Sequence, residues 1–335
     1  MEIKITSSEH DQRFDRFLRK YFKNNPEVKL TDIFSRIRKG AIVVNGKKVP
    51  ENYRVIENDI VTINEKKQTK KDPLKIKINK EDKKYNIDLD DVKKSILYED
   101  SNRIFWNKEP GIVVHPGNQH LTDITLNDLL EQYVNCTSGK KSNMFKPSFG
   151  FRLDKDTSGI IVGAKNYDAL KYLNEIIRDR QTNKTYLAIV RGKFPKALTM
   201  DLPIFRGFNK KFGRAQSFVN IETGKHAKTS AWNIKTLKNA DLGTVSLIGI
   251  KIHTGRMHQI RTHLSHEGFA IIGDQLYGNN EINQIASKKH KINRQLLHSW
   301  QYGFYDKYGK ADIEIKSPIP EDFKILFKNI DLNEK

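Results

Sequence analysis

A lysine-rich segment interrupts the pattern of apolar residues and most constrains how this chain can fold. Residues 66–91 contain many lysines and few large apolar side chains, so this stretch cannot bury enough surface to pack by itself. The full length of 335 residues also exceeds what one hydrophobic core usually serves. We therefore predict a small domain at residues 1–65, a basic linker at residues 66–91 and a large domain at residues 92–330.

The small domain is predicted to combine two short helices with several strands. Apolar residues recur at helical spacing in residues 14–22 and again in residues 30–37, before Gly40 supplies a stop. Strands are expected at residues 1–9, 41–44, 47–49 and 60–63. The pair Asn45-Gly46 predicts a tight two-residue turn, because both residues accept the positive φ angles that such a turn requires.

The large domain is predicted to be built mainly from strands. They are expected at residues 96–98, 103–106, 112–114, 160–164, 186–190, 244–252 and 270–272. Helical patterns occur at residues 169–179 and 257–266. Because few helices of crossover length separate successive strands, we expect an α+β fold with a mixed, largely antiparallel central sheet.

The charge balance favours a polyanionic partner. Sixty Lys and Arg residues against forty Asp and Glu residues give a formal net charge of +20. Such an excess suits nucleic acid or an anionic membrane, although a lysine-rich proteome would produce the same composition. No apolar run approaches the roughly 20 residues needed to cross a bilayer. The first residues also lack the apolar stretch of a secretory signal, so we expect no membrane association.

The cysteine count limits the chemistry further. Cys136 is the only cysteine, so neither a disulfide framework nor a cluster of zinc-binding cysteines can form. A reducing compartment, the cytoplasm, fits best. We expect no metal and no cofactor, and we expect a monomer.

Basic residues concentrate at one end of the small domain. They are Arg36, Arg38 and Lys39 in the second helix and Lys47 and Lys48 after the turn. The surrounding pattern resembles the alpha-L RNA-binding domain, named for a ribosomal protein called S-four. The matching residues are Ser35-Arg36, Arg38-Lys39-Gly40, Val43-Val44-Asn45-Gly46 and Asn58-Asp59. The resemblance implies that the five basic residues contact RNA phosphates.

The most informative segment of the large domain is Phe151-Arg152-Leu153-Asp154-Lys155-Asp156-Thr157-Ser158-Gly159, which leads into an apolar strand. Loops at the ends of buried strands commonly present catalytic groups on a rigid scaffold. Asp and Lys also populate ordinary turns, so this segment alone does not identify a site.

Further blocks of the sequence support a functional role for this segment. They lie at residues 107–117, 184–192, 253–264 and 273–278, with weaker blocks at 222–225, 297–298 and 318–323. Together these blocks resemble the RluA-type family of RNA pseudouridine synthases, whose signature is Arg-Leu-Asp, a basic residue, Asp, Thr, Ser or Thr, and Gly. The resemblance extends over residues 93–327 and implies the pseudouridine synthase fold. It also implies an isomerase that converts uridines to pseudouridine and acts on RNA.

The resemblance also implies roles for individual residues. Asp154 would be the nucleophile and Arg261 the cation that keeps it ionised. Tyr186 would stack on the uracil and accept the proton from C5. Arg152 would fill the space left by the flipped nucleotide. The other expected substrate-binding residues are Leu153, His115, Lys184 and Arg256.

Two departures from the family pattern stand out. Phe151 replaces the usual His, which removes any hydrogen bond from an imidazole, and Glu109 is inserted in the usual Lys-Pro pair. The pairing of the two domains resembles the large-subunit ribosomal RNA enzymes of the family, with transfer RNA as the alternative substrate. The sequence does not choose between attack at uracil C6 and participation at the ribose.

Three other functions compete with this interpretation. A metal site would need a trio of ligands, but His258 and His263 are five residues apart and diverge on a helix. A serine hydrolase would need a Gly-x-Ser-x-Gly turn, which Ser158 lacks. A non-catalytic RNA-binding assembly factor is the main rival, and the presence of Asp154, Tyr186 and Arg261 argues against it.

Overall fold

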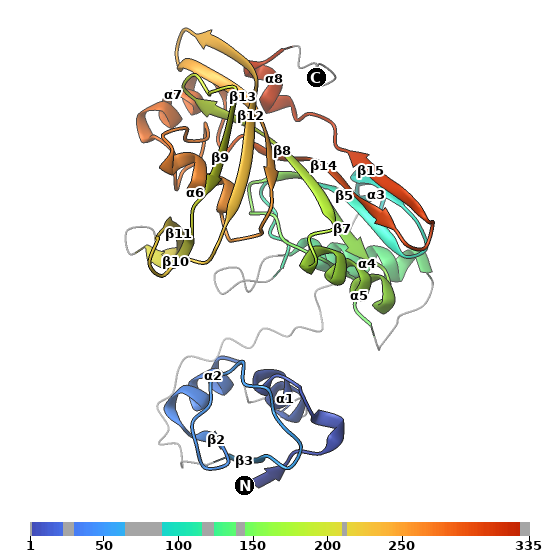
Figure 1. The fold of residues 1–335 in the computed structure, drawn as a ribbon. Helices are drawn as coiled ribbons and strands as arrows, with labels where there is room; N and C mark the ends of the chain where they lie inside the picture. The colour runs from blue at the N-terminus through green and yellow to red at the C-terminus, as the bar shows by residue number, and fades with distance from the viewer. Residues whose placement is uncertain are drawn as a thin grey trace, which may run out of the picture. The chain divides into compact units, whose positions relative to one another are not determined.

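The structure is a computed structural model that describes residues 2–22, 30–63, 89–115, 124–138, 145–209 and 213–328. The chain divides into two compact units, Met1–Lys83 and Lys84–Lys335, which are described separately (Figure 1). Most of the predicted linker at residues 66–91 lies outside the described residues. The structure describes the chain again from helix α3 (Leu89–Lys94), whose Val92 belongs to the core of the second unit.

The first unit is a three-stranded antiparallel sheet with helices α1 (Phe14–Tyr21) and α2 (Leu30–Lys39). The strands are β1 (Glu2–Lys4), β2 (Ile42–Val44) and β3 (Ile60–Ile63), in the order β1-β3-β2. Apolar side chains from both helices and all three strands form one core, which confirms the two helical patterns and the strands predicted at residues 41–44 and 60–63. A short 3-10 helix, η1 (Ser7–Glu9), follows β1.

Two predicted strands of this unit are wrong in extent. The strand expected at residues 1–9 ends at Lys4 because the chain turns into η1. Residues 47–49 form no strand beyond a single bridge between Lys47 and Val44. The turn itself is confirmed, with φ angles of 49° at Asn45 and 74° at Gly46. Strand β3 is the antiparallel partner of β2 in the sheet, and Ile60 N donates to Asn45 Oδ1 at 2.8 Å.

The second unit is built on a ten-stranded sheet in the order β4-β5-β7-β14-β8-β13-β12-β9, with β6 beside β7 and β15 beside β14. The strands are β4 (Ile96–Glu99), β5 (Arg103–Lys108), β6 (Ser148–Phe149), β7 (Ser158–Ala164), β8 (Thr182–Arg191), β9 (Ala197–Asp201), β12 (Lys228–Asn239), β13 (Gly243–Ile252), β14 (Leu297–Asp306) and β15 (Ala311–Lys316). Among the described strands, only β7 and β14 pair in parallel. The mixed, largely antiparallel sheet and the α+β class are therefore confirmed.

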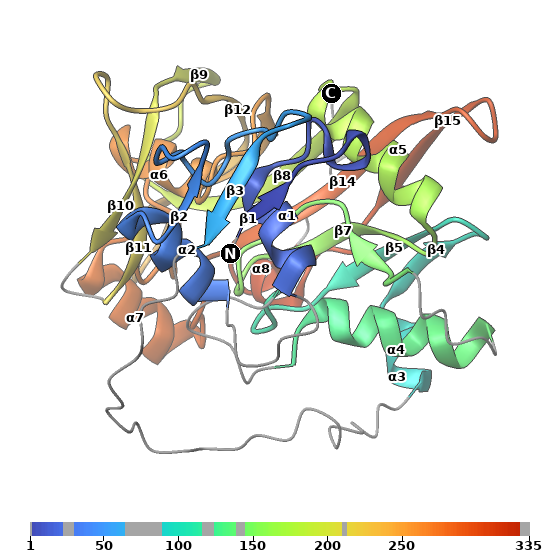
Figure 2. The same ribbon diagram turned by 90° about the horizontal axis from the view of Figure 1, so that it is seen from below.

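Helices cover both faces of the central strands. The remaining helices are α4 (Leu126–Ser138), α5 (Tyr167–Arg178), α6 (Gln259–His266), α7 (Asn280–His290) and α8 (Glu321–Leu326). Strand β7 is buried along its whole length, because Ile161 faces the core that includes α4 while Ile160 and Val162 face the core that includes α5. Figure 2 shows α4 and α5 on opposite sides of the sheet.

Two further predicted strands are absent from the sheet. At residues 112–114 the carbonyls of Val113 and Val114 accept hydrogen bonds from Leu126 N and Asn127 N, so they bond the first turn of α4 rather than a strand. At residues 270–272 the chain meets β8 in one isolated bridge, Ile271 to Val190, where Arg191 N donates to Ala270 O and Ile272 N donates to Ile189 O. A pattern of apolar residues cannot distinguish a buried strand from a buried segment that forms no continuous ladder with a neighbouring strand.

Candidate active site

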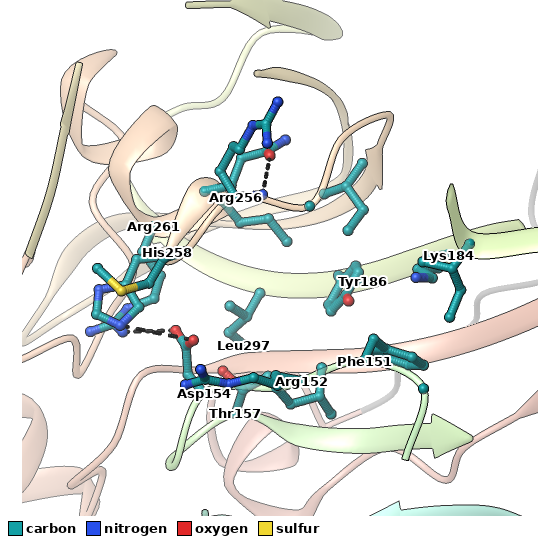
Figure 3. Close-up of a pocket in the computed structure, with 18 of the residues that line it drawn as sticks. Phe151, Arg152, Asp154, Thr157, Lys184, Tyr186, Arg256, His258, Arg261 and Leu297 are labelled. Carbon is teal, nitrogen blue, oxygen red and sulfur yellow. Dashed lines mark hydrogen bonds and ion pairs between the residues drawn. The ribbon is translucent and has the colours of Figure 1, made fainter. Parts of the chain in front are cut away.

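Eight residues singled out by the sequence line one cavity of about 540 Å³ in the second unit. They are His115, Arg152, Leu153, Asp154, Lys184, Tyr186, Arg256 and Arg261. They come from the segment after β5, from the loop before β7, from β8, from the segment before α6 and from α6 itself, and Figure 3 shows Arg152 and Arg261 close to Asp154. The sheet order brings these distant segments together, since β14 holds β7 and β8 on its two sides.

The loop that carries Asp154 is held by backbone and side-chain hydrogen bonds. Thr157 N donates to Asp154 O at 3.1 Å. Lys108 Nζ donates to Lys155 O at 2.8 Å, and Arg294 Nη1 donates to Asp156 O at 3.1 Å. Burial lowers the pKa of Lys108 to about 7, and both the charged and the neutral amine can donate to Lys155 O and to Glu109 O. The turn between residues 154 and 157 is therefore fixed from two sides.

Asp154 and Asp274 share the guanidinium of Arg261. Arg261 Nη1 donates to Asp154 Oδ2 at 2.8 Å, while Nε and Nη2 donate to the two Asp274 oxygens at 2.7 and 2.8 Å. Asp274 is completely buried, and its carboxylate orients the guanidinium through this bidentate pair. The Asp154 side chain keeps 26% of its surface exposed toward the cavity. One carboxylate therefore supports the arginine and the other remains accessible.

The surroundings of Asp154 favour its ionised form. Burial alone would raise the pKa of the Asp154 carboxyl, but the positive charges of His258 and Arg261 outweigh it and hold that pKa below its usual value. His258 Nε2 lies 3.9 Å from Asp154 Oδ1 (Figure 3). His258 adopts a left-handed φ of 54°, and its Nδ1 lies 2.9 Å from the hydroxyl of Tyr277.

The sequence motifs predicted no role for His258, Asp274 or Tyr277. All three lie inside the motif blocks identified in the sequence, which was the available signal. The Tyr277 ring also lies under the Arg261 guanidinium, with 4.9 Å between the guanidinium carbon and the ring centroid. What these three residues contribute depends on their distances from Asp154 and Arg261 in the folded chain, and a sequence motif does not give these distances.

Tyr186 and Lys184 project from the same face of β8. Burial, together with the charge of Asp154, raises the pKa of Tyr186, against a hydrogen bond with Ser299, so its phenol is neutral at neutral pH. Lys184 Nζ lies 4.2 Å from the centroid of the Phe151 ring and 5.4 Å from that of Tyr302. Burial lowers the pKa of Lys184 to about 8. Phe151, which departs from the family pattern, therefore supports this ammonium by a cation–π contact.

The remaining predicted substrate-binding residues differ in how firmly they are held. Arg152 is exposed beside Asp154. Arg256 Nε donates to His226 O at 3.0 Å, and His115 Nδ1 lies 2.6 Å from Asn127 Nδ2. Leu153 is buried under the loop. The cavity thus combines a buried apolar side with several cations at its edge.

The predicted RNA-binding residues belong to the first unit. Arg38, Lys47 and Lys48 are exposed and Arg36 is half-buried, whereas the side chain of Lys39 lies outside the described residues. The Lys48 side chain lies against Gly40, where an added Cβ would be 2.1 Å from its Cε. This contact brings the turn next to the end of α2. The motif pieces Asn45 and Asp59 also meet, since Asn45 Nδ2 donates to Asp59 Oδ1 at 2.7 Å.

The described residues contain no helix long and apolar enough to cross a membrane. Within the same ranges, no three His, Cys, Asp or Glu side chains are grouped as they would be around a metal ion.

Comparisons with known proteins agree on one family. A family model described as RNA pseudouridylate synthase matches residues 102–266. The chain is 30% identical to ribosomal large subunit pseudouridine synthase C of Buchnera aphidicola subsp. Baizongia pistaciae, over 98% of this chain and 96% of the relative. It is 32% identical to an uncharacterized RNA pseudouridine synthase, YlyB, of Bacillus subtilis, over 99% of both chains. It is 33% identical to ribosomal large subunit pseudouridine synthase D of Borreliella burgdorferi, over 70% of this chain and 68% of the relative.

Solved structures share the fold. Human RNA pseudouridylate synthase domain containing 4 matches with a TM-score of 0.56 and 22% identity, over 71% of this chain and 93% of the other. Human RNA pseudouridylate synthase domain containing 1 matches with a TM-score of 0.52 and 24% identity, over 67% and 82%.

Proposed function

The chain belongs to the RluA-type family of RNA pseudouridine synthases, and on this premise we propose that it isomerises uridines of large-subunit ribosomal RNA with Asp154 as nucleophile. Family membership makes the protein an isomerase. The observation that carries the further proposal is the ion pair between Arg261 and Asp154, at 2.8 Å in a cavity that leaves the carboxylate accessible. A nucleophilic carboxylate must be ionised, and this geometry favours that form.

The reaction is an isomerisation, so the atomic composition of the nucleotide does not change. It needs a nucleophilic carboxylate and the transfer of protons. The bond between ribose C1′ and uracil N1 breaks, a bond from C1′ to C5 forms, C5 loses its proton, and N1 gains one. Asp154 serves either proposed route, addition to uracil C6 or participation at the ribose carbon. The protein's contribution is to hold the base and the ionised carboxylate together after the base is detached.

Base flipping exposes the bond that breaks, because a stacked nucleotide hides it. Arg152, exposed and two residues before Asp154, is positioned to fill the space that the nucleotide leaves. Tyr186 lines the cavity, where its ring would stack on the uracil. Because the phenol of Tyr186 stays neutral, its ring can stack on the uracil. A neutral phenol is a weak base, so abstraction of the C5 proton is the more demanding of the two roles proposed for Tyr186.

The preference for large-subunit ribosomal RNA rests on the relatives. Two of the three relatives described above are named as ribosomal large subunit enzymes, and they cover most of this chain. The first unit supports the same assignment, because its exposed basic residues and alpha-L pattern suit contacts with structured RNA. An enzyme with such a substrate takes part in ribosome biogenesis and acts in the cytoplasm.

The test is to map pseudouridines across total RNA from cells that carry the gene, lack it, or carry Asp154→Asn in its place. We expect one or more large-subunit sites to disappear in both altered strains, because the amide fills the same space but cannot attack. Purified Asp154→Asn should retain its affinity for RNA while losing turnover. Loss of a transfer RNA site alone would replace the proposed substrate, and full activity of Asp154→Asn would remove the nucleophile assignment.

Tyr186→Phe separates the two roles of the tyrosine. Stacking survives in this variant, whereas the hydroxyl is removed. If Tyr186→Phe forms product at the normal rate, the stacking role of Tyr186 stands and its role as proton acceptor is wrong.

A further inference from the structure

A two-stranded hairpin stands outside the central sheet, next to the catalytic residues. It consists of β10 (Ile204–Asn209) and β11 (Arg214–Val219), which pair only with each other as strands. Figure 1 shows it beside α6. Ser217 fixes it there, because its Oγ donates to Met257 O at 2.6 Å and its N donates to Tyr277 Oη at 2.8 Å. The same Tyr277 lies under Arg261, so the hairpin is tied directly to the residues around Asp154.

One face of the hairpin is turned toward the cavity. Arg206 lies opposite Ser217 in the register, and Arg206 itself lines the cavity. Side chains of a strand alternate between its faces, so Phe208 shares the face of Arg206 and lies about 7 Å further along the strand. Phe205 and Phe218 lie on the other face, where their rings contact Gly207.

Phe208 has no obvious structural reason to be aromatic. Its side chain is 66% exposed, and the residue opposite it is the small Ala215. An exposed phenyl ring on the same strand face as an arginine that lines the cavity is a combination by which proteins bind single-stranded nucleic acid, with a ring for stacking and a cation for the phosphate. Arg256, which also lines the cavity, adds to the positive charge.

We propose that Phe208 stacks on an unpaired nucleotide next to the flipped uridine, while Arg206 contacts the adjoining phosphate. This inference rests on the proposed function, since it identifies how the same cavity recognises the strand that carries its substrate. The hairpin thereby prefers uridines in loops or in helices that open easily, because the neighbouring base must also be free to stack.

The experiment compares Phe208→Leu, which keeps an apolar side chain without a π-face, with Phe208→Trp, which keeps the π-face. Phe205→Leu is the matched control on the opposite face of the same strand, and Tyr167→Leu is a control at an equally exposed aromatic residue of α5, 67% exposed. The substrate is an unmodified in vitro transcript of large-subunit ribosomal RNA. A short oligouridine with one 2-aminopurine, whose fluorescence reports stacking, serves as a second probe that requires no turnover.

Phe208→Leu should raise the RNA concentration needed for half-saturation about 5- to 150-fold, the range expected when one base–aromatic stack is removed. The saturated single-turnover rate should stay within about twofold of wild type. Phe208→Trp and both controls should bind like wild type. Quenching of 2-aminopurine should fall in Phe208→Leu and persist in Phe208→Trp.

Unchanged binding of both probes by Phe208→Leu would overturn the inference. Equal losses in Phe208→Leu and Phe208→Trp, or a loss in Phe205→Leu, would also overturn it, because they indicate a structural role or a protein-docking face. A wild-type protein that does not convert the transcript, while Phe208→Leu still loses oligouridine binding and quenching, would refute the ribosomal substrate and leave the stacking role standing.

Discussion

Arg261 lies between two carboxylates that serve different purposes. The bidentate pair with buried Asp274 determines where the guanidinium points, and the third donor then reaches Asp154. Because Asp274 has no exposure, it depends on Arg261 for its counter-charge. The folding of this region and the ionisation of Asp154 therefore depend on one side chain, and a single substitution at Arg261 alters both.

A double substitution separates these two effects. Arg261→Gln should lower the free energy of unfolding by about 3–5 kcal/mol, since it leaves Asp274 buried and uncompensated. Adding Asp274→Asn should restore much of that stability, because the orphaned charge is gone, but should not restore turnover. Chemical denaturation and single-turnover assays of the wild type and the two variants measure the two outcomes. Recovery of activity together with stability would show that Arg261 acts only on folding.

Arg261→Gln should also change how activity depends on pH. In the wild type the pKa of Asp154 is lowered, so the stability and activity that its charge supports are present above the usual carboxyl pKa and are lost as pH falls through the lowered value. Without Arg261, burial has more influence and the acid limb of kcat/KM should move to higher pH.

We expect Lys184 to make a pH-dependent contact with RNA. Its pKa is lowered from 10.5 to about 8 by burial, so the ammonium form is present below about pH 8 and disappears as the pH rises through that value. The kcat/KM of the wild type should therefore fall above pH 8, because a neutral amine does not attract phosphate. Lys184→Arg should remove this alkaline limb, since a guanidinium stays charged. A profile of Lys184→Arg identical to that of the wild type would assign the limb to another group.

At the scale of elements, the parallel pairing of β7 and β14 positions the loop that carries Asp154. Gly159 lies at this pairing with a φ of +105°, and an added Cβ would lie 2.2 Å from the carbonyl oxygen of Ser299. The glycine that ends the sequence motif is thus required by the close approach of two strands. Its role is structural, although it lies five residues after Asp154.

Gly159→Ala tests this requirement against Gly243→Ala. Gly243 also has a positive φ, +73°, but nothing lies within 4 Å of an added Cβ, so only conformational strain of about 1–2 kcal/mol is expected there. Gly159→Ala should cost about 4 kcal/mol or more, because backbone must also move. Equal unfolding free energies for the two variants would show that the strands separate without penalty.

At the scale of the whole molecule, the two units have separate cores. Among the residues that the structure describes, the core of the second unit is made by residues from Val92 onward and the core of the first unit by residues up to Ile63. The described residues that line the cavity around Asp154 all belong to the second unit. We therefore expect chemistry to reside in the second unit and affinity for structured RNA to be shared.

A chain that begins at Lys84 should fold and retain its saturated single-turnover rate. Starting at residue 92 instead would cut α3. The truncated protein should bind RNA less tightly, and its salt dependence should flatten by about 0.7 to 0.9 in slope for each RNA phosphate that the first unit would otherwise neutralise. Arg36→Glu with Arg38→Glu in the full chain should reproduce part of this weakening. Equal slopes for full and truncated protein would show that the first unit does not bind RNA phosphates.

Local patterns determined much of this protein. Apolar periodicity predicted β7, α5 and α6, because a period of two or of 3.6 is written in neighbouring residues. The Asn45-Gly46 turn followed from backbone sterics alone. Family resemblance in the motif blocks then predicted which residues line the cavity, and the structure brings all eight of them together.

Tertiary structure decided the rest, because it depends on contacts between residues far apart in the chain. The place of β14 between β7 and β8 brings His298 opposite Ser158, 140 residues earlier, which no local pattern encodes. The strands expected at residues 112–114 and 270–272 also depended on distant partners: the first segment bonds the start of α4, and the second makes only a single bridge to β8. The charge state of Asp154 likewise follows from burial and from the positions of His258 and Arg261, which only the folded chain defines.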